Sequence, residues 1–273
     1  MCYCFEISKS GYYRRKTKEP SVRDKENKEI LELIKDIHKD SRGTYGSPRI
    51  HKEVNRFIRC NHKRTERIMK ENGINACAKK KYRHTTDSEH KKPVAENLLN
   101  QKFDIQEPGI VWAGDITYIS TNEGWLYLAV VIDLFNREIV GWSLDSRINE
   151  SLVTNALVMA FLRKPPKKNC IFHSDRGSQY CSKNFRKKLE SNDLKQSMSR
   201  KGNCWDNACV ESFFHSLKVE EVYRNKYKTR KEAKRNVVEY MEIFYNRKRI
   251  HSTLNYKSPL QYERDWYKLK NIA

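Results

Sequence analysis

The sequence lacks any apolar segment long enough to cross a membrane. Its longest apolar run, Leu126 to Ile132, is far shorter than the roughly 20 residues that a membrane-spanning helix requires. No hydrophobic segment preceded by positive charge opens the chain, so no secretory signal is expected. We therefore expect a cytoplasmic protein that neither spans a membrane nor is secreted.

Internal repeats and low-complexity segments are also absent, and the cysteines show no pairing pattern. The 8 cysteines are scattered, and a chain of 32.5 kDa is large enough to fold without disulfide staples. Cys2-x-Cys4 and the isolated His38, His51 and His62 do not form a zinc motif. Reduced thiols and no structural zinc are the expectation.

Acidic residues are few relative to basic ones. The chain has 55 Lys and Arg against 34 Asp and Glu, a net charge of +21, and an isoelectric point near 9.6. Clustered cations gain free energy by displacing the counterions that surround phosphates. Nucleic acid is therefore the favoured partner over a membrane surface. The 11% aromatic content supplies buried area and argues against wholesale disorder.

The first third of the chain is predicted to be helical and basic. Apolar residues at helical spacing predict a helix from Glu29 to Lys39. Ser47-Pro48 offers an N-cap and a first-turn proline for a second helix that runs to Phe57. Asn61 can cap a third helix that ends near Gly73. The apolar stripe of the first helix consists of Ile30, Leu33, Ile34 and Ile37.

Three short helices with a basic last helix resemble a helix-turn-helix module, and a small bundle with solvated charges fits the spacing equally well. We assign residues 1–78 to this helical DNA-binding region and residues 79–107 to a basic linker that tracks phosphate or stays mobile. The candidate DNA contacts in the two segments are Arg64, Arg67, Lys70, Lys79, Lys80 and Lys81.

Residues 108–273 show an α/β pattern. Three β-rich segments, 110–120, 125–134 and 137–144, are separated by turn signals and predict a meander of adjacent strands. The elements expected after them are a helix over 150–163, a strand over 169–173, a helix capped by Ser182, a strand near 195–198 and helices from Asp206 to about Arg247. On the helix over 150–163, the residues expected to face inward are Leu152, Ala156, Val158, Met159 and Leu162.

Three carboxylates are notable for their positions. Asp115 lies inside an apolar strand, where an ionised side chain is costly unless a cation or a donor pairs with it. Asp175 follows the strand that ends at His173, and Glu211 lies in a helix with Lys218 two turns further on, about 10 Å along the axis. Taken singly, Asp115 is better explained as a core residue with satisfied hydrogen bonds, Asp175 as a turn residue and Glu211 as part of a solvated helix face.

Taken together, the three carboxylates form a donor set for hard metal ions. Oxygen donors without nearby Cys or His ligands suit Mg²⁺ or Mn²⁺ rather than Zn²⁺. Two such ions, roughly 4 Å apart, can activate an attacking hydroxyl and stabilise the leaving oxygen in phosphodiester displacement. Lys218 can hold a phosphate backbone while Glu211 faces a metal.

The spacing of the carboxylates and the sequence around them resemble a known family. There are 59 residues between Asp115 and Asp175, and 35 between Asp175 and Glu211. The segments that carry the resemblance are Trp112 to Tyr118, His173 to Tyr180, Asp206 to Phe214, Tyr245 to Leu254 and, nearer the N-terminus, Ser10 to Tyr13, Tyr45-Gly46 and Lys70 to Ile74. They are similar to DDE transposases and retroviral integrases, and in particular to the second-reading-frame catalytic protein of the insertion sequence three family.

The resemblance implies a bacterial, nucleoid-associated transposase with an RNase H-like core, preceded by a helix-turn-helix region and followed by C-terminal helices. It assigns Asp115, Asp175 and Glu211 to catalysis and to two Mg²⁺ ions, and Lys218 to donor DNA. It also implies that the element's ends are cleaved and joined through a circular intermediate, by a homo-oligomer on double-stranded DNA. Related proteins are often made as fusions with an upstream-frame product that bears a coiled coil, and no such heptads occur here.

Two other functions remain open at this stage. One is a catalytically silent, sequence-specific DNA-binding regulator, against which the three intact carboxylates argue. The other is an RNase H-type nuclease that cuts without joining strands. A DNA donor with a free 3′-OH separates this nuclease from a transposase, because only the transposase forms a joined product.

Overall fold

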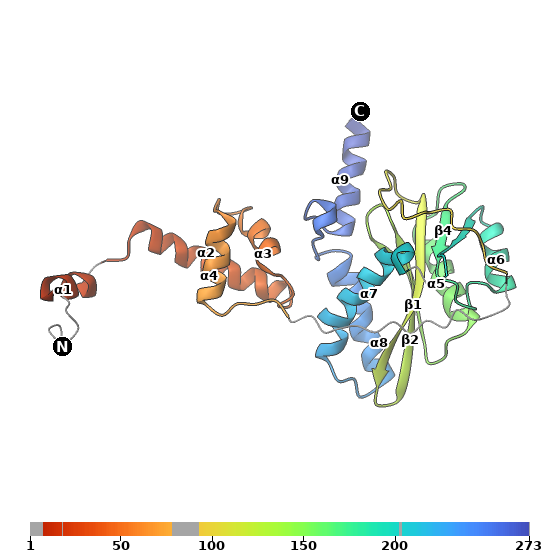
Figure 1. The fold of residues 1–273 in the computed structure, drawn as a ribbon, viewed down its shortest axis with the longest axis horizontal. Helices are drawn as coiled ribbons and strands as arrows, with labels where there is room; N and C mark the ends of the chain where they lie inside the picture. Colours follow the sequence, from red (N-terminus) through yellow and green to blue (C-terminus); the bar gives the residue numbers. More distant parts are fainter. Residues whose placement is uncertain (1–7, 18, 78–92, 202–203, 273) are drawn as a thin grey trace. The chain divides into compact units, whose positions relative to one another are not determined.

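The computed structural model describes residues 8–17, 19–77, 93–201 and 204–272. The chain folds as two compact units, Met1–Ala76 and Cys77–Ala273, whose elements are labelled in Figure 1. The predicted DNA contacts Lys79, Lys80 and Lys81 lie outside the described residues. Among the described residues, no helix has both the length and the apolar character needed to cross a membrane.

The first unit contains four helices, α1 (Lys9–Thr17), α2 (Val22–Asp40), α3 (Ser47–Val54) and α4 (His62–Glu71). Helix α2 starts seven residues before the predicted Glu29 because Ser21 and Asp24 form a capping box: each side chain accepts a hydrogen bond from the other residue's backbone N–H. The apolar stripe was found correctly, since Ile30 and Ile34 are buried.

The ends of α3 differ from the prediction, and those of α4 agree with it. Gly46, not Ser47, is the N-cap of α3, and the helix stops at Val54 rather than Phe57. Asn61 caps α4 as predicted, its side-chain oxygen accepting from the Lys63 N–H at 2.9 Å. The described side chains that form the core of this unit include Ile30, Ile34, Ile50, Val54, Ile68 and Met69.

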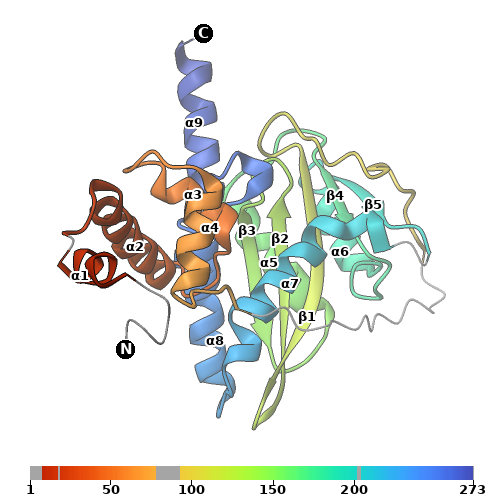
Figure 2. The same cartoon turned by 60° about the vertical axis from the view of Figure 1, so that its left-hand side comes forward.

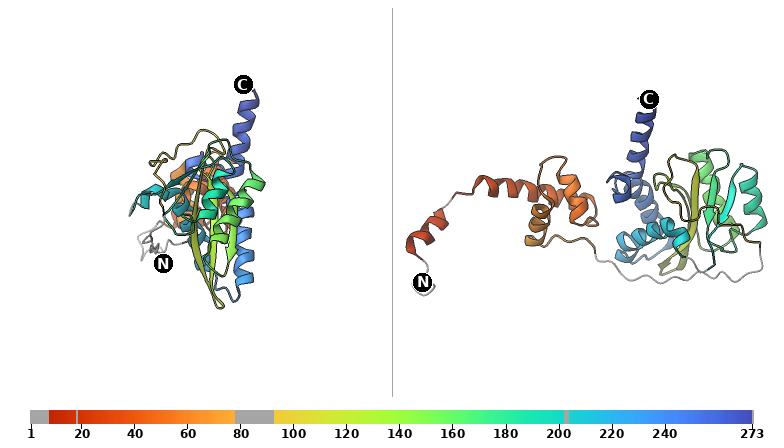
Figure 3. Two further views of the ribbon diagram at one scale, coloured as in Figure 1. Left: turned by 90° about the vertical axis from the view of Figure 1, so that its right-hand side faces the viewer. Right: turned by 45° about the horizontal axis from the view of Figure 1, so that its top comes forward.

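The second unit is built on a five-stranded sheet in the order β3-β2-β1-β4-β5, visible in two orientations in Figure 3. The predicted meander is present as three antiparallel strands, β1 (Val111–Thr121), β2 (Gly124–Asp133) and β3 (Ile139–Asp145). Two short strands, β4 (Ile171–Ser174) and β5 (Lys195–Met198), then add in parallel next to β1.

Helices cover both faces of this sheet. Helices α5 (Glu150–Arg163) and α6 (Lys183–Glu190) pack in one core cluster. Helix α7 (Ala208–Glu220) crosses β1, as Figure 2 shows. The remaining elements are the short helices η1 (Cys204–Asn207), η2 (Val222–Arg224) and η4 (Ser252–Leu254), helix α8 (Arg230–Glu239), the π-helix η3 (Tyr240–Tyr245) and helix α9 (Pro259–Ile272).

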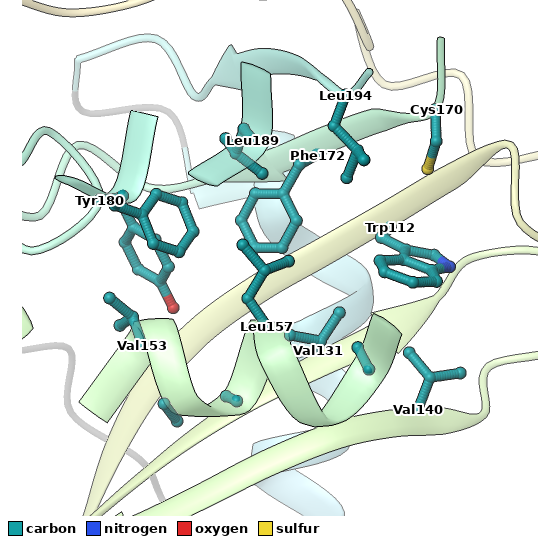
Figure 4. Packing of buried hydrophobic residues seen from close by; sticks show 14 of the residues in the cluster. Trp112, Val131, Val140, Val153, Leu157, Cys170, Phe172, Tyr180, Leu189 and Leu194 are labelled. Carbon is teal, nitrogen blue, oxygen red and sulfur yellow. The ribbon is translucent and has the colours of Figure 1, made fainter. Parts of the chain in front are cut away.

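The predicted inward face of α5 is partly wrong. Leu162 is 82% exposed, whereas Val153 and Leu157 are buried and point from α5 toward Tyr180 and Phe172 in Figure 4. A Cβ on Gly141 would lie 2.2 Å from the Ala156 carbonyl oxygen. The backbone of β3 therefore touches the face of α5 that carries its small residues, and this contact sets the rotation of the helix.

Candidate active site

The pairing of β1 with β4 places two of the predicted carboxylates next to each other. The two strands are parallel, and their last registered pair is Gly114 with Ser174. Asp115 comes next on β1 and Asp175 is the first residue after β4, so their backbones lie side by side where the pairing of two strands about 4.8 Å apart ends.

Local contacts fix the backbone around both aspartates. A Cβ on Gly114 would lie 2.6 Å from the ring of Phe172, so the absence of a side chain at this position leaves room for that ring over β1. The Asp175 side chain accepts a hydrogen bond from the Gly177 N–H at 2.9 Å, which closes the turn after β4. The buried His173 ring lies between the hydroxyls of Ser197 and Ser199, at 2.9 and 3.1 Å.

Glu211 reaches the same region from α7. Burial raises the pKa of Asp115 well above its usual range, and the charges of Asp175 and then Glu211 raise it further. The three carboxylates therefore lie within electrostatic range of one another although they come from separate elements. They repel when all are ionised, and such repulsion is relieved by a cation or by protons.

Lys218, also on α7, is the nearby cation. Its side chain is only 3% exposed, and its ammonium lies 4.7 Å from the centroid of the Tyr118 ring. Burial lowers the pKa of Lys218 to about 8, while Asp115 acts in the opposite direction. The predicted proximity of Lys218 to the carboxylates is present, through Asp115, but the amine is buried rather than solvated.

Sequence reasoning missed the role of Asp206, which precedes α7. This buried carboxylate accepts two hydrogen bonds from the Arg200 guanidinium, at 2.8 and 3.0 Å, and one from its backbone N–H at 2.9 Å. Asn97 and Gln101 each donate a further bond at 2.9 Å. The pKa of Asp206 lies well below its usual value because of the bond to Arg200. Asp206 thus ties segment 93–107 to the start of the helix that carries Glu211.

The chemistry of the donor set fits a hard divalent cation. Asp115, Asp175 and Glu211 offer carboxylate oxygens, which Mg²⁺ and Mn²⁺ prefer. Within the described ranges, no group of three or more His, Cys, Asp or Glu side chains converges closely enough to hold a metal ion. The backbone brings Asp115 and Asp175 side by side, and Glu211 adds to the charge at Asp115.

The predicted DNA contacts of the first unit differ in their surroundings. Arg64 bonds within the unit, to Glu26 at 2.6 Å and Asn27 at 2.8 Å, and so joins α4 to α2. Arg67 and Lys70 are exposed on the outer face of α4, and Arg67 lies 3.9 Å from Glu71. Only these two of the three predicted contacts present their charge to solvent.

Comparison with known proteins agrees with this architecture. The family model described as an integrase core domain matches residues 105–204, a second model with the same description matches 211–265, and an HTH-like domain matches 25–82. An intasome structure from simian T-cell lymphotropic virus, in complex with a PP2A regulatory subunit, aligns with a TM-score of 0.49 at 17% identity, over 84% of this chain and 74% of that chain.

Similar curated proteins cover the whole chain. An uncharacterized 31 kDa protein of insertion element IS600 from Shigella sonnei is 43% identical over 98% of this chain and 99% of its own length. Transposase InsF of insertion sequence IS3A from Escherichia coli is 40% identical over 100% of this chain and 94% of its own length.

The integrase core and the helix-turn-helix-like region define a polynucleotidyl transferase that acts on DNA in transposition. The chain belongs to the IS3 family of transposases. The predicted α/β core, with a helix-turn-helix-like region before it and helices after it, is confirmed, as is the predicted transposase function.

Proposed function

We propose that Asp115, Asp175 and Glu211 are the catalytic carboxylates of this transposase, which cleaves the ends of an insertion sequence and joins each freed 3′-OH to another phosphodiester. The observation that supports this most directly is the parallel register that ends at Gly114 and Ser174. It brings two acidic residues to one end of the β1–β4 pairing. Their mutual repulsion lowers the stability of the fold, and such a cost is typical of a functional site.

Mg²⁺, with Mn²⁺ as a substitute, is the proposed cofactor, and two ions are expected. When bound, the ions would polarise the scissile phosphate and offset the charge that develops there. The chain's own part is to hold Asp115 on β1 and Asp175 in the turn directly after β4, and to bring Glu211 from α7. Because the Lys218 ammonium interacts with Asp115, we assign Lys218 to the scissile strand of the donor DNA, which must displace the cover over this buried side chain.

The partners follow from the same chemistry. Arg67 and Lys70 on α4 are proposed to contact duplex DNA, and Lys79, Lys80 and Lys81 to contact its phosphates. Because two element ends must meet for joining, we propose a homo-oligomer on DNA, with an upstream-frame product as a possible fusion partner. The protein would act in the bacterial cytoplasm, at the nucleoid.

Single substitutions test the assignment of the carboxylates. Asp115→Ala, Asp175→Ala and Glu211→Ala should each abolish strand transfer while DNA affinity stays nearly unchanged, because many separate cations carry the binding. Glu190→Ala, which removes an exposed carboxylate of α6, should retain activity. Robust joining by one of the three variants would remove that residue from the site.

Metal dependence and the type of product complete the test. Joining should require Mg²⁺ or Mn²⁺ and fail with Ca²⁺, whose coordination is longer and looser. Calorimetric titration of Mn²⁺ should show weaker binding to the Asp115→Ala protein than to wild type. Full turnover in EDTA would end the metal proposal, and cleavage without joining to a 3′-OH donor would indicate a nuclease.

A further inference from the structure

The tip of the β1–β2 hairpin carries exposed aromatic rings. Trp125 is 49% exposed and Tyr223, in η2, is 41% exposed. The Tyr118 ring packs edge-on against Trp125 with centroids 5.0 Å apart. The segment that follows Tyr223 lies against the hairpin tip, since the Asn122 N–H donates to the Tyr227 carbonyl. Tyr118, Trp125 and the neighbouring Tyr223 make up the aromatic cluster, to which two separate parts of the chain contribute.

This cluster is continuous with the candidate active site. The ammonium of Lys218 lies 4.7 Å from the Tyr118 ring centroid and interacts with Asp115. Trp125 pairs with Ser120, five residues along β1 from Asp115. At about 3.4 Å per residue this is roughly 17 Å along the backbone of β1.

Hydrogen bonds hold the hairpin tip against the segment after η2. The Asn122 N–H donates to the Tyr227 carbonyl at 3.1 Å. Arg230 donates its backbone N–H to Glu123 at 2.7 Å and its Nε to the Trp125 carbonyl at 3.1 Å. The backbone that carries Trp125 is thus held in place, which reduces the entropy lost when a ligand stacks on the ring.

The segment beside the rings is basic. Arg224, Lys226 and Lys228 are exposed and follow Tyr223 closely in the chain. Alternation of aromatic and cationic side chains is suited to a ligand that combines flat apolar surfaces with negative charge, as a nucleic acid strand does. Bases within a duplex hide their faces, so only an unpaired or terminal base can stack on an exposed ring.

We propose that Trp125 and Tyr223 form a stacking site for unpaired bases at the end of the donor DNA, whose phosphates contact Arg224, Lys226 and Lys228. The proposal rests on the function assigned above, because cleavage and joining occur at DNA ends. It adds a place at the hairpin tip, five residues along β1 from Asp115, where a frayed strand is held.

The test compares two DNA probes in the absence of metal. One is a blunt duplex, and the other is the same duplex with a few unpaired nucleotides at one end, one of them 2-aminopurine. Wild-type protein should bind the frayed probe more tightly and quench the 2-aminopurine fluorescence. Trp125→Ala should lose about ten-fold of the affinity for the frayed probe, as loss of one stacked base predicts, and Trp125→Phe should retain most of it.

A matched control is available on α9. Tyr267 is 48% exposed and packs edge-on against Trp266 with centroids 5.0 Å apart, much as Trp125 packs against Tyr118. Tyr267→Ala should leave both affinities unchanged. Equal binding of the frayed probe by wild type and Trp125→Ala, or an equal loss in Tyr267→Ala, would overturn the proposal.

The outcome is separable from that of the proposed function. Asp115→Ala should keep the preference for the frayed probe, since stacking needs no chemistry at the carboxylates. If wild type joins strands but Trp125→Ala binds frayed DNA normally, only the stacking site fails. If the preference is present but wild type does not join strands, only the proposed function fails.

Discussion

A buried ion pair holds α7 against the C-terminal helices and gives the sharpest stability prediction. Glu220, the last residue of α7, accepts two hydrogen bonds from the Arg249 guanidinium, at 2.6 and 2.8 Å. The Tyr240 hydroxyl donates to the same carboxylate at 2.7 Å. Both charged side chains are buried. Burial alone would lower the pKa of Arg249, but Glu220 outweighs it and raises that pKa above its usual value.

Removal of either partner should be costly because the other charge stays buried. Glu220→Ala and Arg249→Met should each lower the free energy of unfolding by about 3–5 kcal/mol, the usual cost of an uncompensated buried charge. The double variant should lose much less than the sum, with a coupling energy of about 2 kcal/mol or more. The partly exposed pair Lys257–Asp265, at 2.6 Å, is the control, and Asp265→Ala should cost less than about 1 kcal/mol.

Denaturant unfolding followed by tryptophan fluorescence measures these changes in one unit. All 5 tryptophans lie at or after residue 112, so the signal reports on the unit Cys77–Ala273 alone. Shifts in the urea midpoint at constant slope give the free energies. Single variants that each cost under about 1 kcal/mol, or that add without coupling, would refute the assignment of Glu220 and Arg249 as a buried pair.

Three further predictions concern the site and the first unit. Lys218→Ala should slow cleavage of an element-end duplex more than it weakens bulk DNA binding, and Lys218→Arg should recover part of the rate; equal single-turnover rates for both and the parent would exclude this role. Gly114→Ala places a Cβ 2.6 Å from the Phe172 ring, so it should cost about 1–3 kcal/mol and slow strand transfer, and an unchanged urea midpoint would contradict this. Burial, then a neighbouring histidine, lowers the pKa of His51 from 6.5. The unfolded chain therefore takes up this proton first, and the first unit should lose stability as the pH falls through 6.5; equal hydrogen-exchange protection of α3 and α4 above and below that pH would argue against it.

The strands and two of the helix caps, Asn61 and Ser182, were predictable because their signals are local. The β-rich segments separated by turn residues gave the meander of β1, β2 and β3, and Asn61 gave the start of α4. The rotation of α5 was not predictable from periodicity, since the helix is apolar on nearly every side. Small residues carried the missing signal: Gly141, Ala156 and Ala160 meet where the backbones touch.

The meeting of Asp115 with Asp175 required information that no local pattern holds. It depends on the pairing of β1 with β4, which joins residues far apart in the chain and leaves no room for a side chain at Gly114 against the Phe172 ring. The resemblance to a known family predicted that the two aspartates act together. The residue pattern alone predicted only that each of them lies in or near a strand. Spacing along the chain cannot report a register that tertiary packing sets.

Residue type alone also cannot separate a ligand from the residues that position it. Asp206 and Glu211 are both acidic, lie five residues apart in one sequence segment, and would be equal candidates for a metal ligand. The structure distinguishes them by their partners: Asp206 is saturated by Arg200, Asn97 and Gln101, so its oxygens have little capacity left for a cation. Glu211 instead adds to the repulsion at Asp115. An acidic residue with every oxygen satisfied serves the fold, and one that raises the charge of a shared site is the better candidate for catalysis.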